Sequence, residues 1–198
     1  MQHFRNPRTI QNMKIFFIAI FLSFGINLSN AQNINAPGNL ESPKPLSCIK
    51  LSEVTNENNP ADILNGMRKC IDQKDYKNAA RLFAIAGVYG KYDSFRVKDK
   101  TAHQALLVLQ QSIFFDLDES EQNSLMSQLE KELEKGSNNL NEVCQSIQKI
   151  GVPKYYPKYM VQHGIQAFSD NNADGLVENF DSQKSWELAL KEYLHCGE

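Results

Sequence analysis

The sequence predicts an all-α protein: a single compact domain of about six or seven helices that follows a cleaved signal peptide. Three observations predict this fold. Apolar residues recur at helical spacing from about residue 60 to the C-terminus. No run of alternating β-branched residues bounded by turn signals competes with that spacing. An apolar stretch near the N-terminus has the length of a signal-peptide core.

Residues 1–31 are predicted to be a leader and signal peptide. Their apolar core, residues 15–26, is too short to span a bilayer, and small residues before the next segment place cleavage after Ala31. Either Met1 or Met13 begins the translated chain. We therefore expect an exported protein with no membrane span after cleavage, periplasmic if the source is a Gram-negative bacterium and otherwise secreted.

The charge balance argues against two classes of partner. Removing 31 of the 198 residues leaves 167, and the three cations lost with the leader change the formal net charge from −2 to −5. An acidic chain has no electrostatic attraction to nucleic acid or to an anionic membrane surface. We expect neither as a partner.

Four cysteines remain after cleavage: Cys48, Cys70, Cys144 and Cys196. An even number in an exported chain favours two disulfides, and none of the four lies in a CxxC pair. Three connectivities are possible. We favour Cys48 with Cys70 and Cys144 with Cys196, because these pairs would fix the N-terminal segment and the last helix. Lipid attachment at Cys48 is a weaker alternative, since this cysteine lies far beyond the apolar run.

Residues 32–47 are rich in proline and amides and are predicted to form a flexible or extended strap, which leaves residues 48–198 as the helical domain. The first helix begins after the cap residue Asn59. The second helix runs from Tyr76 to about Val88, and the glycines that follow predict an aromatic loop over residues 87–95.

The remaining helices are predicted from their caps and apolar faces. The third follows a cap at Asp99 or Thr101, and its broad apolar stripe predicts that it is the central helix. The fourth, which lies on the surface, begins at Asp118 and Glu119, the fifth at Ser137 or Asn138, the sixth near Pro157, and the last at Ser182 or Ser185.

Residues 73–79, QKDYKNA, followed by Phe83 and Ala86, resemble the turn and second helix of a tetratricopeptide or Sel1-type repeat. The resemblance covers residues 61–94, and no second copy follows at the repeat length. The resemblance implies a helical hairpin whose small residues allow its two helices to pack closely. It also implies a role in peptide or protein binding.

Two aromatic groups are candidate partner-binding surfaces, because tyrosine combines an apolar ring with a polar tip. They are Tyr89, Tyr92 and Phe95 in the predicted loop, and Tyr155, Tyr156 and Tyr159 near the sixth helix. The second group, with His163, is also where an enzyme with an unrecognised site would place its chemistry. No hydrolase, nucleotide-binding or protease motif is present, so no catalytic residue is predicted.

Residues 170–181, DNNADGLVENFD, follow the order of a calcium-binding loop. Asp170, Asn172, Asp174 and Asp181 would supply side-chain oxygens, with Gly175 at the turn. Asp181 is shorter than the usual closing glutamate, and the same residues are typical of a turn between helices. We favour the turn and keep a weakly bound calcium as the alternative, with no other cofactor expected.

Together these features predict an exported binding protein, without a recognisable catalytic site, that acts on a protein partner. Periplasmic immunity proteins resemble it in size, address and fold class alone. The alternatives are an enzyme with its site around Tyr155 to His163, or a structural envelope protein with a weak calcium loop.

Overall fold

The computed structural model describes residues 35–169 and 174–197, and their secondary structure is helical, as predicted. The predicted leader and the predicted cleavage site lie outside the described residues. Within the described ranges, β-structure is limited to one isolated bridge between Val97 and Leu176. None of the described helices has the length and apolar character needed to cross a membrane. The α-helices are α2 (Pro60–Asp72), α3 (Tyr76–Arg96), α4 (Ala105–Phe115), α5 (Glu119–Leu133), α6 (Asn138–Ile150), α7 (Lys158–Val161) and α8 (Ser182–Leu194), and the 3-10 turns are η1 (Leu51–Glu53), η2 (Lys100–Gln104) and η3 (Ile165–Phe168).

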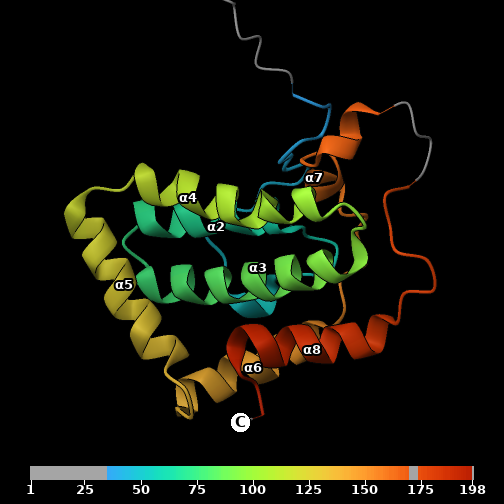
Figure 1. Ribbon diagram of the computed structural model, residues 1–198. Helices are drawn as coiled ribbons and strands as arrows, with labels where there is room; N and C mark the ends of the chain where they lie inside the picture. The colour runs from blue at the N-terminus through green and yellow to red at the C-terminus, as the bar shows by residue number, and fades with distance from the viewer. Residues whose placement is uncertain (1–34, 170–173, 198) are drawn as a thin grey trace, which may run out of the picture. The chain divides into compact units, whose positions relative to one another are not determined.

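Helix α3 is the centre of the fold. It packs against α2, α5 and α8, and Figure 1 shows these helices around it. Its alanines, Ala79, Ala80, Ala84 and Ala86, are fully buried. Small side chains allow neighbouring helices to approach closely, so α3 can be covered on several sides.

The prediction that the second helix ends near Val88 was wrong, because α3 continues to Arg96. Glycine weakens a helix but does not end one when packing compensates. A Cβ built on Gly87 would lie 2.0 Å from the Tyr193 ring of α8, and one on Gly90 would lie 2.6 Å from Leu106 of α4. The two glycines are therefore contact points for neighbouring helices, and the expected loop over residues 87–95 does not exist.

The prediction that the third helix is central was also wrong. The segment opens with η2, where the Asp99 side chain accepts from Thr101 N, and continues as α4. Within α4 only Ala105 is fully buried. One face, including Leu106, Leu109 and Ile113, packs on the core, while the opposite face is open. α4 is therefore a peripheral helix with apolar side chains on both its inner and its outer face.

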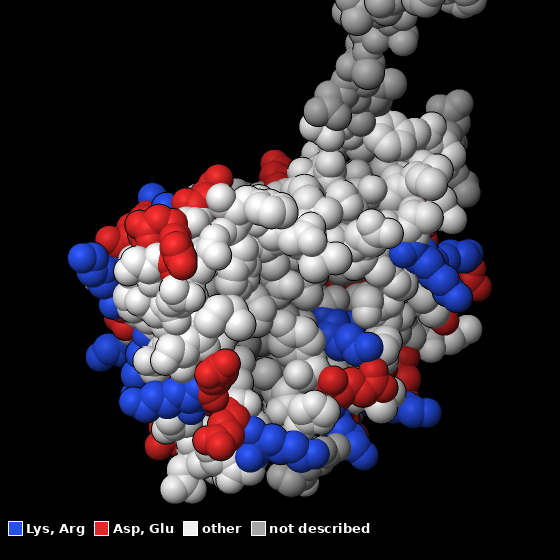
Figure 2. Space-filling model, turned by 60° about the vertical axis from the view of Figure 1, so that its left-hand side comes forward, with Lys and Arg blue, Asp and Glu red and all other residues white. Residues whose placement is uncertain are grey.

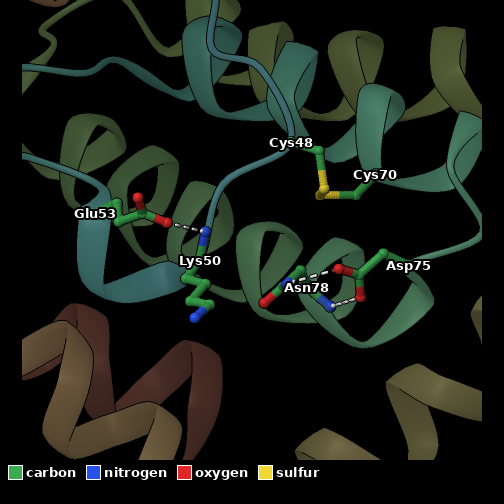
Figure 3. Close-up of a disulfide and its surroundings, with 6 residues drawn as sticks. All are labelled: Cys48, Lys50, Glu53, Cys70, Asp75 and Asn78. Carbon is green, nitrogen blue, oxygen red and sulfur yellow. Dashed lines mark hydrogen bonds between the residues drawn. A yellow bond between two sulfur atoms is a disulfide. The ribbon is translucent and has the colours of Figure 1, made fainter.

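The segment before α2 is held along the domain by Asp62. This buried carboxylate accepts hydrogen bonds from Ser42 Oγ and Lys44 N, both at 2.8 Å, and the Asp62 carbonyl accepts one from Leu46 N at 3.2 Å. The Cys48–Cys70 disulfide follows directly and joins this segment to α2. Figure 3 shows this disulfide close to the start of α3, where Asp75 accepts hydrogen bonds from Asn78.

We predict that Gly66→Ala lowers the melting temperature. Alanine would favour the helix by up to about 1 kcal/mol, but its Cβ would lie 2.9 Å from Ser47 O and 3.1 Å from Leu46 Cβ. The adjacent disulfide and the Asp62 bonds prevent this backbone from moving away, so overpacking should outweigh the gain and leave a net loss of about 1 to 2 kcal/mol.

Thermal unfolding followed by circular dichroism checks this prediction. Lys69→Ala, at an exposed position of the same helix, is the matched control and should change the melting temperature little. An unchanged or higher melting temperature for Gly66→Ala would show that the segment over α2 yields easily.

Candidate binding groove

The outer face of α4 is uncharged, and its exposed residues include two large apolar side chains. The chain carries no lysine, arginine, aspartate or glutamate between Thr101 and Phe115. Leu107 is 53% exposed and Phe115 is 83% exposed. Figure 2 shows a broad uncharged area over the upper part of this side of the molecule, with charged side chains gathered around and below it. Large apolar groups that gather on a surface indicate a contact site.

A groove of about 960 Å³ lies where the end of α4 meets α3 and α5. We call it the α4–α5 groove. Its apolar lining consists of Phe83, Phe114, Met126, Leu129 and Leu133, and its polar lining of Ser127, Glu130, Lys131 and Glu134. Leu129 is buried and Met126 is 47% exposed, so the lining extends from the core to the surface. An open apolar groove edged by charges suits a protein segment better than a small polar substrate.

The walls of the groove are held in place by packing and by a buried ion pair. The Phe83 ring meets the Phe114 ring edge-on, with centroids 6.2 Å apart. Arg81 of α3 binds Glu132 of α5 at 2.7 Å, and Glu132 is only 1% exposed. Gln128 also donates to Glu132, at 3.1 Å. The position of α5 against α3 is therefore strongly specified.

The α5 side of the groove is acidic. Residues 116–135 contain seven acids and two lysines. One of the acids, Glu132, is neutralised by Arg81. Within the groove lining itself, Glu130 and Glu134 outnumber Lys131. The formal charge of this wall is negative, whereas the facing α4 contributes no formal charge.

The tyrosines predicted to contact a partner are mostly internal. Tyr89 and Tyr92 are buried in α3, and Phe95 is half-buried beside them, because the segment is a helix and not a loop. Tyr89 Oη donates to Gly151 O at 3.1 Å. This first group does not present a partner surface in the described fold.

Tyr155 and Tyr159 belong to a buried polar cluster around Asp93. Both hydroxyls donate to Asp93 Oδ2 at 2.8 Å, and Arg96 pairs with Asp93 Oδ1 at 2.7 Å. The Arg96 guanidinium also lies 5.0 Å from the ring centroids of Tyr92 and Tyr155. The cluster fastens α7 and the segment before it to the C-terminal half of α3.

The electrostatics of this cluster favour a structural role. Burial raises the pKa of Asp93, while Arg96 and the two hydroxyls oppose that rise. Burial and the nearby Asp93 also raise the pKa values of Tyr155 and Tyr159 well above the usual value. Both phenols therefore stay protonated as hydrogen-bond donors, and neither is activated as a base or nucleophile.

Tyr156 is the exposed member of the second group, and it donates to Asp174 O at 2.6 Å. The histidines have separate structural partners. His103 Nε2 bonds to Val97 O and His163 Nδ1 bonds to Asn39 Oδ1, each at 2.8 Å. Partial burial lowers the pKa of His163. The tyrosines, His103 and His163 thus hold backbone segments together.

The calcium candidates divide between described and undescribed residues, since Asp170 and Asn172 lie outside the described ranges. Asp174 Oδ1 accepts from Leu176 N, and Asp181 Oδ1 accepts from Lys184 N as the cap of α8, both at 3.0 Å. Gly175 O accepts from Lys98 N at 2.9 Å. Among the described residues, no three acids, histidines or cysteines gather as a metal site would require. The described part of this segment has the bonding of a turn.

The sequence predicted a broad apolar stripe on the third helix and a fourth helix on the surface, but not a groove between them. The available signal was the absence of charge from residue 101 to residue 115, together with apolar residues on both faces of that segment. A helix with two apolar faces is either central or open to a partner, and periodicity alone does not separate these cases.

Comparison with known protein families, with curated proteins and with solved structures gave no match.

Proposed function

We propose that this chain is an exported helical binding protein without a catalytic site, which holds a protein partner in the α4–α5 groove and neutralises it, as immunity or inhibitor proteins do. If the source is a Gram-negative bacterium, its compartment is the periplasm. The observation that carries the proposal is the apolar groove beside an uncharged, exposed α4.

Two further observations support the proposal. The disulfides Cys48–Cys70 and Cys144–Cys196 are the favoured pairs, and two disulfides in a small domain are typical of an oxidising compartment. The reactive-looking groups around Tyr155 are engaged with one another inside the protein. An external apolar surface is left as the feature best suited to recognition.

Pull-down from an envelope extract of the source organism tests this function. Met126→Glu places a charge in the groove at a position that is already 47% exposed, so the fold should tolerate it. Wild-type protein should capture a partner that Met126→Glu captures at least about tenfold less, since a buried unpaired charge costs well over 1.4 kcal/mol.

Leu188→Glu is the matched control, because it makes the same kind of change at an exposed apolar residue of α8, outside the groove. It should capture the partner as wild type does. Equal capture by wild type and Met126→Glu would show that the groove is not the contact surface.

A further inference from the structure

We propose that the occupant of the α4–α5 groove is an amphipathic α-helix of the partner, with basic residues beside its apolar face. This inference rests on the proposed function and specifies the chemistry of the partner. It follows from the spacing of the apolar lining and from the charge of the α5 wall.

The spacing of the lining on α5 fits a helix. Met126, Leu129 and Leu133 stand at i, i+3 and i+7, so they form one apolar line over two turns, about 10 Å long. Phe83 and Phe114 add an aromatic wall to the groove. A helix laid in such a groove presents side chains at the same i, i+3, i+4 and i+7 spacing, which is the usual form of helix recognition by a groove. An extended strand finds no unpaired sheet edge here, since the walls are helices.

The charged residues of the groove lining determine which apolar helices can bind. Glu130 and Glu134 stand in the groove lining, where Lys131 is the single cation. Lysine or arginine beside the apolar face of the ligand would meet this wall with complementary charge. Glutamate at those positions of the ligand would be repelled by the acidic wall.

The same charges disfavour two other occupants. A symmetric dimer through the groove would place the acidic α5 walls of both copies in one interface, because a two-fold interface uses the same surface patch on each subunit. An anionic lipid surface would be repelled by those acids. A basic amphipathic helix satisfies both the apolar lining and the negative rim.

Two fluorescein-labelled synthetic peptides of 18 residues test the inference by fluorescence anisotropy. Both carry leucine at i, i+3, i+4 and i+7; one has lysine and the other glutamate at the flanking positions. The lysine peptide should bind the full-length mature protein about tenfold more tightly at low ionic strength, and the difference should shrink in about 0.5 M salt.

Variants separate apolar from electrostatic binding. Met126→Glu should weaken the lysine peptide at least about threefold, because the new carboxylate would be buried beneath the apolar face of the bound peptide. The double change Glu130→Gln and Glu134→Gln should narrow the preference for the lysine peptide about threefold or more. Glu187→Gln, at an exposed acid of α8, is the control and should leave the preference unchanged.

Each other outcome overturns the inference and leaves the pull-down result as an independent measure of the proposed function. If both peptides bind equally and Met126→Glu weakens the binding of both, the groove binds apolar helices without selecting for their charge. If Met126→Glu leaves the affinity for the lysine peptide unchanged, that peptide binds acidic residues outside the groove. Absence of binding by either peptide means that the occupant is not a basic amphipathic helix. A wild-type dimer in sedimentation that Met126→Glu disrupts assigns the groove to a second copy, and binding to phosphatidylcholine vesicles that Met126→Glu abolishes assigns it to a bilayer.

Discussion

Replacing Asp93 with alanine should lower the free energy of unfolding by about 3 to 5 kcal/mol, the usual cost of breaking a buried ion pair from one side. Asp93 is fully buried and accepts hydrogen bonds from Arg96, Tyr155 and Tyr159. The substitution would leave the Arg96 charge and two hydroxyls without their acceptor inside the protein. It would also release α7 and the segment before it from α3.

Urea denaturation followed by far-UV circular dichroism measures this loss. Asp72→Ala is the matched control, because Asp72 pairs with Arg68 at 2.9 Å while remaining partly exposed, and it should cost less than about 1 kcal/mol. If Asp93→Ala does not fold, Asp93→Asn keeps an acceptor for the tyrosines and should give an intermediate loss. A loss for both Asp93 variants no larger than that of Asp72→Ala would contradict the structural role of the cluster.

Removing the Cys144–Cys196 disulfide should destabilise the protein by about 4 kcal/mol, and removing Cys48–Cys70 by about 3 kcal/mol. The first bridge closes 52 residues and the second closes 22, so the longer loop restricts the unfolded chain more. The longer bridge also joins Cys144 of α6 to Cys196, which lies two residues beyond the end of α8. Its loss should therefore loosen the C-terminal helix from the core.

The paired variants Cys144→Ser with Cys196→Ser, and Cys48→Ser with Cys70→Ser, are compared with wild type by the same denaturation experiment. Reducing agent should destabilise wild type more than either double variant, because each variant has only one bridge left to lose. If removing the bridge of the 22-residue loop lowers the free energy of unfolding more than removing the bridge of the 52-residue loop, local contacts and not chain entropy dominate the effect.

Local signals predicted most helix beginnings. Asn59, Asp118 and Ser137 each accept a hydrogen bond from the backbone in the first turn of the helix that follows, as their residue types indicated. A cap acts within three residues, so its information is contained in a short stretch of sequence. The beginnings of α2, α5 and α6 were therefore predictable.

Features that depend on distant packing were not predictable in the same way. The end of α3 was placed near Val88 because Gly87 and Gly90 weaken a helix locally, yet Tyr193 of α8 and Leu106 of α4 pack against those positions. Tyr89 and Tyr92 were assigned to a surface for the same reason and are internal. The candidate groove combines residues of α3, α4 and α5, which no single periodic stretch describes.

The sequence by itself determined that the described domain is all-α and where most of its helices begin, and it favoured one of three possible cysteine pairings, which the structure contains. These properties follow from caps, apolar period and chain order, all of which act over short distances or restrict the choices to a few. Only the tertiary structure decided that α3 is central and α4 is peripheral. Both segments are apolar enough to be buried, and the choice between them depends on which helix the other elements can cover, which is a property of the whole packed chain.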